Sequence, residues 1–252
     1  MVEPMVNNSG KYLYTIIADN TPKDIDLLGI GGSKVYTISN GRIAAVVSDI
    51  TSKKIRPERR NLATHQTVIK HLMKDCTPLP VAFGVIANDE KSIQRILSNN
   101  QNKLTQQLNK VDGKVEMGLR VCWDVPNIFE YFVKLHSDLR IAREYLLDSS
   151  NRLTQQDKIE IGRMFENKLQ ESREVYTNKI CRILLPCCSE IKQNPPRNEY
   201  EIMSLACLVK RDKQQEFEAA IVEAANLFDD HFVFDFNGPW APHNFVNLEL
   251  QF

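Results

Sequence analysis

Apolar and polar residues alternate in several short segments near the N-terminus, which indicates β-strands with one buried face. Asn40-Gly41 separates two of these segments, and this pair is preferred at the centre of a tight hairpin turn. A third segment is continuously apolar after a proline, as expected of a central strand. We therefore predict strands over 12–18, 34–38, 42–48 and 79–86.

Helices are predicted between and after these strands. Apolar residues at every third or fourth position predict a helix over 59–75, and an Asn-Asp-Glu run at 88–90 is a start signal for a helix that ends near Lys110. A short helix over 23–28 follows the first strand. The order strand, helix, strand, strand, helix, strand is the ferredoxin-like pattern, an antiparallel sheet with helices on one face.

The second half of the chain echoes this order with a longer first crossover. A strand over 115–123 precedes two helices that end near 147 and 185, and Thr154 with Asp157 forms a capping pair at the start of the second. A strand over 200–210, a helix over 212–228 and a strand from 232 follow. We therefore predict an α+β fold: an N-terminal ferredoxin-like domain over 1–111, a modified ferredoxin-like domain with a long helical hairpin over 112–236, and an extended aromatic C-terminal tail over 237–252.

The segment 232–239, which leads into the tail, has the clearest local pattern. Phe232, Phe234 and Phe236 recur at period two, which places the three rings on one face of a strand. The following Asn-Gly-Pro run at 237–239 predicts the end of that strand, since proline removes a ladder donor. The aromatic tail then needs a surface to lie on, either on a partner or between the two domains of the chain.

Composition limits the classes of partner. Lys and Arg number 32, as do Asp and Glu, so the formal net charge is zero and no global field attracts nucleic acid or a lipid membrane. The sequence also has no apolar run long enough to span a bilayer. We therefore expect a soluble intracellular protein whose partners are recognised locally.

The cysteines and histidines give little indication of a catalytic or metal-binding site. The six cysteines lie mostly in apolar surroundings and are predicted to be buried thiols; a zinc site from Cys181, Cys187 and Cys188 with a distant histidine lacks the usual spacing. His65 lies on the apolar stripe of its helix, which favours a buried imidazole bonded to a neighbouring strand over a catalytic base or metal ligand. We predict no catalytic, cofactor-binding or metal residues.

One local charge cluster stands out. Two lysines and three arginines lie within eight residues, but no stacking motif accompanies them, which disfavours nucleic-acid binding. A local contact with an anion or an acidic protein stays open there. The cluster consists of Lys53, Lys54, Arg56, Arg59 and Arg60.

Three motifs carry a resemblance to a known family over roughly 12–246. They are Asn61-Leu-Ala-Thr-His65, then Pro78-Leu-Pro80-Val-Ala-Phe83-Gly84, and Gly238-Pro239-Trp240-Ala-Pro242-His-Asn-Phe245-Val246. In this order the motifs resemble those of the gas vesicle protein F/L family. Two positions differ from the family pattern: Ala82 stands where a basic residue is expected, and His243 where tyrosine is usual.

The resemblance implies a function. Members are minor components of gas vesicles, the gas-filled shells that give microbes buoyancy, and engage the small hydrophobic shell protein during nucleation or prevent its aggregation. Other gas vesicle accessory proteins are further expected partners, and the expected location is the gas vesicle inside the cell. The alternatives are an assembly chaperone absent from the finished vesicle and an enzyme that uses His65. The predicted structural motif residues are His65, Pro80, Phe83 and Gly84, and the predicted partner or interdomain contacts are Phe236, Gly238, Pro239, Trp240, Pro242 and Phe245.

Overall fold

The computed structural model describes residues 10–19, 25–148 and 154–250. Their contacts divide the chain into two compact units: unit 1 comprises 1–116 and 239–252, and unit 2 comprises 117–238. The C-terminal tail therefore belongs to the same unit as the N-terminal half of the chain. None of the described helices is long and apolar enough to cross a membrane.

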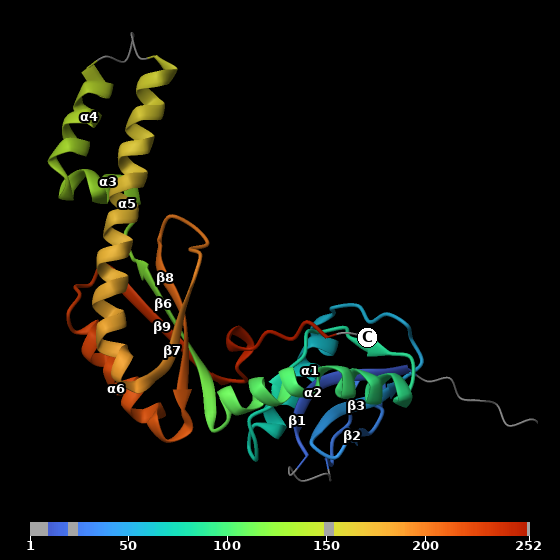
Figure 1. The fold of residues 1–252 in the computed structure, drawn as a ribbon. Helices are drawn as coiled ribbons and strands as arrows, with labels where there is room; N and C mark the ends of the chain where they lie inside the picture. The colour runs from blue at the N-terminus through green and yellow to red at the C-terminus, as the bar shows by residue number, and fades with distance from the viewer. Residues whose placement is uncertain (1–9, 20–24, 149–153, 251–252) are drawn as a thin grey trace, which may run out of the picture. The chain divides into compact units, whose positions relative to one another are not determined.

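Unit 1 contains an antiparallel sheet of five strands (Figure 1). Its order is β2-β3-β1-β4, and β5 also pairs with β1. The Asn40-Gly41 turn forms as predicted, because Gly41 adopts a φ of 89° and the Asn40 side chain accepts the backbone N–H of Ile43 at 3.2 Å. The strands are β1 (Gly10–Ala18), β2 (Val35–Ser39), β3 (Ile43–Ile50), β4 (Leu79–Pro80) and β5 (Ile86–Ala87).

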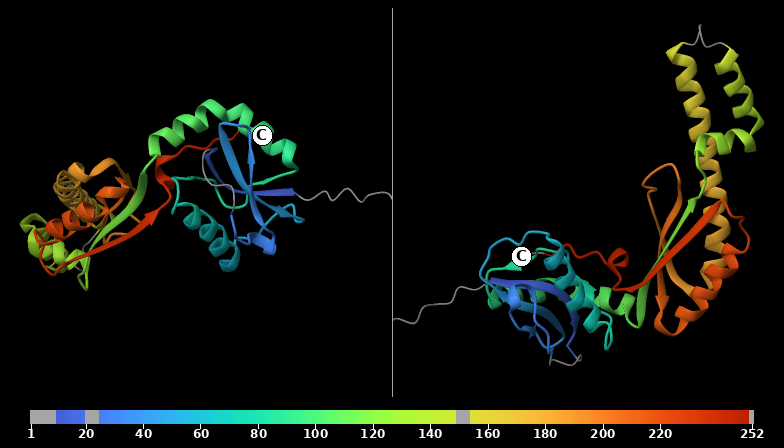
Figure 2. Two further views of the ribbon diagram at one scale, coloured as in Figure 1. Left: turned by 90° about the horizontal axis from the view of Figure 1, so that it is seen from below. Right: turned by 180° about the vertical axis from the view of Figure 1, so that it is seen from behind.

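Helices cover both faces of this sheet, and the prediction that they share one face is wrong for unit 1 (Figure 2). Helix α1 (Arg59–Leu72) adds Val68 and Leu72 to the cluster around Tyr12 and Tyr14, together with the 3₁₀ turn η1 (Ile30–Gly32). Helix α2 (Glu90–Val111) packs against β1, β2 and β3 from the opposite face. The physical reason is that β1 and β3 bury side chains on both faces, so each face needs a cover.

Two local predictions in unit 1 are wrong. The predicted strand over 79–86 is split into β4 and β5, because Phe83-Gly84 forms a turn in which Gly84 has a φ of 92°. The predicted helix over 23–28 is not helical in its described part, since Leu28 pairs with Lys34 in a β-bridge instead. Residues 23 and 24 lie outside the described residues.

Unit 2 holds a second antiparallel sheet of four strands in the order β7-β8-β6-β9. When the four strands of each path are numbered from the first in the chain, both sheets have the spatial order 2-3-1-4. The ferredoxin-like assignment itself stays a prediction. Helices α5 and α6 pack on each other and on β8. The strands are β6 (Lys114–Trp123), β7 (Cys188–Asn194), β8 (Glu201–Lys210) and β9 (Phe232–Trp240), and the helices are α3 (Ile128–Leu135), α4 (Ser137–Asp148), α5 (Gln155–Leu184) and α6 (Gln214–Ala225).

The predicted helical hairpin is present with one break. Helix α5 has 30 residues and begins at the predicted capping box, in which Thr154 and Asp157 bond each other. The preceding helix is interrupted at His136, where the backbone becomes extended, and α4 begins as a new helix at Ser137 with Asp138 in its first turn. Figure 1 shows α4 alongside the N-terminal half of α5, beyond the sheet of unit 2.

Two strands of unit 2 differ from the sequence prediction. Strand β7 was not predicted, because its burial pattern shows no clear alternation. Strand β9 continues through Gly238 and Pro239 to Trp240, although the Asn-Gly-Pro run was predicted to end it. β9 lies at the edge of its sheet, where one side needs no ladder partner and proline is tolerated.

Candidate functional site

The His65 side chain is 2% exposed and lies in a ring cluster with Tyr12, Tyr14 and Phe83. Its Nδ1 lies 3.0 Å from the Tyr12 hydroxyl, which accepts the backbone N–H of Gly84 at 3.1 Å. The Tyr12 hydroxyl and the Nδ1 atom of His65 thus share a hydrogen bond, in which the hydroxyl donates when the imidazole proton lies on Nε2. His65 also bonds the backbone of Val81.

This environment explains the protonation state of His65. Burial lowers the pKa of its imidazole to about 4, and the Val81 hydrogen bond opposes that shift only in part. Tyr12, His65 and the 81–84 turn therefore form one hydrogen-bonded unit that joins β1, α1 and the turn between β4 and β5. The geometry matches the buried structural histidine predicted from the apolar stripe, with the ring nitrogens engaged inside unit 1.

The other predicted motif residues lie around this cluster. Pro80 is buried in β4 and pairs with Thr15 of β1, while Phe83 is half-buried against Tyr12. Gly84 is exposed at the turn whose N–H bonds Tyr12. The described residues contain no group of three or more His, Cys, Asp or Glu side chains placed to hold a metal ion.

The C-terminal tail is anchored within unit 1. Pro242 and Phe245 are buried, and Phe245 is only 2% exposed. Asn244 donates from its backbone N–H and its side-chain amide to the buried Glu116 carboxylate, at 2.7 and 2.6 Å. The Trp240 ring lies beneath the Lys70 ammonium of α1, 4.2 Å from its centroid.

The strand before the tail is more open. Phe232 and Phe234 are half-buried and pack on Phe228, whereas Phe236 is 45% exposed. Gly238 and Pro239 are exposed as well. Of the six predicted contact residues, the structure thus brings Trp240, Pro242 and Phe245 together on unit 1 and leaves the other three on the exposed part of β9.

The largest exposed apolar side chains of the helical hairpin meet in a groove between α4 and α5. Ile141 and Tyr145 are 65% and 57% exposed, although both are large apolar residues. The groove has a volume of about 460 Å³. Its lining consists of Ile141, Ala142 and Tyr145 from α4, Ile161 and Met164 from α5, and the acidic residues Asp138, Asp157 and Glu160.

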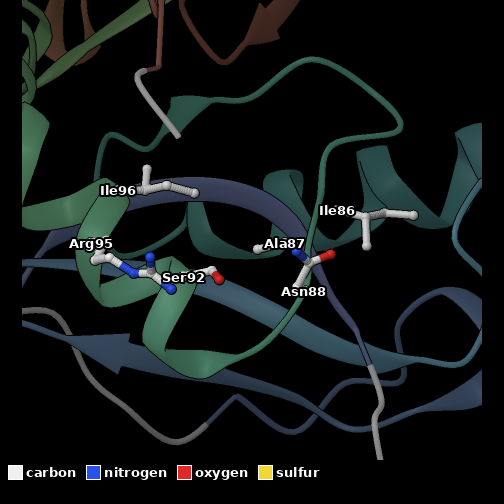
Figure 3. Close-up of a pocket in the computed structure, with 6 residues that line it drawn as sticks. All are labelled: Ile86, Ala87, Asn88, Ser92, Arg95 and Ile96. Carbon is white, nitrogen blue, oxygen red and sulfur yellow. The ribbon is translucent and has the colours of Figure 1, made fainter.

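A smaller pocket lies between α2 and β5 (Figure 3). Its volume is about 220 Å³, below the roughly 300 Å³ at which small-molecule sites usually begin. Figure 3 shows Ser92, Arg95 and Ile96 on α2 across from Ala87 and Asn88. The Asp89 carboxylate at the start of α2 accepts the Ser92 N–H at 2.7 Å, and this bond lowers the pKa of Asp89, with smaller effects from the Arg95 and Lys91 charges.

Comparison with known proteins identifies the family. The family model described as gas vesicle synthesis protein GvpL/GvpF matches residues 10–247. The chain belongs to the GvpL/GvpF family. Gas vesicle protein F of Dolichospermum flosaquae is 26% identical to it, over 94% of this chain and 98% of that protein. Gas vesicle protein L of a Streptomyces species is 23% identical, over 87% of this chain and 86% of that protein.

Two crystal structures of GvpF proteins share the fold. The GvpF structure from Anabaena sp. PCC7120 has a TM-score of 0.85 and 25% identity, and covers 96% of this chain and 99% of its own. The GvpF structure from Microcystis aeruginosa has a TM-score of 0.82 at 22% identity, covering 95% and 99%. The predicted resemblance and the mixed α+β fold with two antiparallel sheets are confirmed.

Membership of the GvpL/GvpF family implies a role connected with gas vesicles and association with them. The family is one of gas vesicle proteins and is not known as an enzyme family. The sequence analysis missed the groove between α4 and α5. The sequence does indicate this groove, because Ile141 and Tyr145 are four residues apart on a helix and lie off the apolar stripe that packs inward.

Proposed function

We propose that this protein binds the small hydrophobic shell protein of gas vesicles and covers its apolar surface until that protein is built into the shell. A shell subunit that borders a gas space must expose apolar area before it is packed, and such area drives aggregation unless it is covered. Membership of the GvpL/GvpF family supports the gas vesicle context. The structural observation that carries the proposal is the apolar groove between α4 and α5.

The groove suits an amphipathic helix. Its lining includes aliphatic, aromatic and thioether side chains, and its volume of about 460 Å³ accommodates two or three large apolar side chains. The Asp138 carboxylate pairs with the Lys168 ammonium at 3.7 Å, and the Asp157 carboxylate bonds Thr154. The Glu160 carboxylate is therefore the lining charge that would favour a basic residue beside the apolar face of a partner helix. A methionine in the lining, Met164, adapts to different side-chain shapes.

The binding test compares two pairs of exposed apolar residues in unit 2. Ile141→Glu with Tyr145→Glu places charge in the groove, while Val175→Glu with Val222→Glu adds the same charge at side chains that are 63% and 59% exposed outside it. We expect the groove pair to weaken capture of unassembled shell protein at least about tenfold, since central apolar contacts are worth over 1 kcal/mol each. Equal capture by both variants in a pull-down titration would remove the groove from the proposal.

A second experiment separates a retained component from a transient chaperone. Floated vesicles from the native host are washed with increasing urea, and the washed shells and the soluble fraction are blotted for this protein. Retention on washed shells identifies a structural component. Loss into the soluble fraction together with unassembled shell protein identifies a chaperone, and absence from both fractions contradicts a role at the shell.

A further inference from the structure

A second surface of the molecule is strongly cationic. It is formed by the five side chains defined above at 53–60, which we call the basic segment: Lys53, Lys54, Arg56, Arg59 and Arg60. All five side chains are exposed, and Glu58 is the single acidic residue among them. In the part of the chain that the structure describes, none of the five forms an ion pair.

The basic segment accounts for a charge asymmetry within a neutral chain. Unit 1 carries 16 Lys and Arg against 12 Asp and Glu, a formal charge of +4, and unit 2 carries 16 against 20, a formal charge of −4. The segment 53–60 alone carries five cations against one anion, also +4. The formal net charge of unit 1 is therefore equal to the net charge of the segment 53–60 alone.

The stretch is held in place by the fold. The Ile55 side chain packs against the core cluster around Tyr12 and Tyr14. The Arg56 carbonyl accepts the Glu58 N–H at 2.8 Å and the Asn61 side-chain amide at 3.1 Å. A run of like charges is ordinarily a solvated, mobile feature, whereas this one is presented on an anchored backbone.

The position of the arginines is unfavourable for the helix that follows. Arg59 and Arg60 occupy the first turn of α1, where the helix macrodipole favours acidic side chains, and the Glu58 side chain makes no capping bond. These charges therefore do not stabilise α1. Local choices that cost stability are expected where a surface serves binding.

A polar pocket of about 450 Å³ adjoins the basic segment. Its lining includes the polar residues Ser33, Thr51, Ser52, Arg60 and Asn61 and the apolar residues Ile30, Ile50 and Ile55. Asp49 also lines it, but its carboxylate is bonded by the Lys11 ammonium and by the Tyr36 hydroxyl at 2.9 Å. The Asp49 charge is thus compensated inside unit 1.

We propose that the basic segment and this pocket dock an acidic polypeptide segment of a partner protein. Its carboxylates would pair with the exposed cations, and an apolar side chain would enter the pocket over the isoleucines. A nucleic acid fits less well, because no Phe, Tyr or Trp ring in the described part of unit 1 is fully exposed for a base to stack on. The surface lies in unit 1 and is independent of the α4–α5 groove in unit 2 that carries the proposed function.

The test uses a fluorescein-labelled 12-residue peptide with alternating glutamates and interspersed leucines, measured by anisotropy with the full chain. Arg56→Glu with Arg59→Glu should weaken binding about tenfold or more, and raising salt should weaken binding by the unchanged protein. Lys74→Glu with Lys91→Glu changes the net charge equally at exposed positions of unit 1 outside the segment and should keep most of the affinity. The same peptide with glutamine for glutamate should not bind.

A thermal scan of each variant checks that the protein is still folded. Arg59→Glu alone places an acid in the first turn of α1, so it should weaken peptide binding while raising Tm by about 1–3 °C. Equal peptide affinity of the two double variants would overturn the proposal. Tighter binding of a 12-nucleotide RNA that depends on Arg56 and Arg59 would overturn it in favour of nucleic acid, and salt-sensitive self-association lost in the same variant would assign the surface to a second copy of this chain.

Discussion

Unit 1, to which the C-terminal tail belongs, and the helical hairpin of unit 2 differ in how far their aromatic and apolar side chains are exposed. In unit 1, several residues of the family motifs are buried: His65 bonds Tyr12, and Phe245 lies beside the Asn244–Glu116 hydrogen bonds. In unit 2, Ile141 and Tyr145 stay more than half exposed on a helix. These buried motif residues thus stabilise unit 1, whereas the proposed groove of unit 2 contains no motif residue.

The largest effect should come from a pair of phenylalanines in the last strand and tail. Phe245→Ala removes a side chain that is 2% exposed and should lower the free energy of unfolding of unit 1 by about 3–5 kcal/mol. Phe236→Ala changes a ring that is 45% exposed and should cost less than about 1 kcal/mol. Urea titrations of both variants measure the difference. Similar costs for the two would show that the tail is not an integral part of unit 1.

The next effect is a pH dependence from His65. The pKa of His65 in the folded chain is about 4, below the ordinary 6.5. Between these two pH values the imidazole binds a proton in the unfolded chain but not in the folded chain. Stability should therefore fall as the pH drops from 7 to 4, and His65 should contribute about 3 kcal/mol of that loss. Urea titrations of wild type and His65→Gln across this range isolate the contribution, because the variant should lose that part of the slope.

A control for this experiment lies on the same helix. His71→Gln removes a half-buried imidazole from α1 and serves as the matched control for His65→Gln. If His65→Gln and His71→Gln give the same profile, the imidazole of His65 is not kept neutral by burial, and the account of the Tyr12 hydrogen bond is wrong.

The smallest of these effects concerns the tail hydrogen bonds. Asn244→Ala leaves the Glu116 carboxylate, which is 7% exposed, without its side-chain donor and should lower stability by about 1–3 kcal/mol. Asn247→Ala changes an exposed neighbour and should be near neutral. Thermal scans compare the two. Shell-protein capture by the Asn244 variant should match wild type while the protein is folded, and a selective loss would move the binding surface from the α4–α5 groove to the tail.

Local patterns in the sequence were enough for several features. The Asn40-Gly41 hairpin, the Thr154–Asp157 capping box and the buried position of His65 follow from interactions within a few residues or from one helical stripe. The break at His136 was missed although Ser137-Asp138 is a local start signal, because the apolar stripe continues through it. The extension of β9 through Pro239 could not be predicted, since it depends on β9 being an edge strand.

The sequence by itself determined the family, the α+β class and the main strands and helices, because periodicity and motif spacing record which side of each element is buried. Only the tertiary structure decided where the tail lies, that helices cover both faces of the first sheet, and that Ile141 and Tyr145 form an open groove. These outcomes depend on contacts between residues far apart in the chain, such as Asn244 with Glu116, and no local pattern specifies which distant surface will complete the packing.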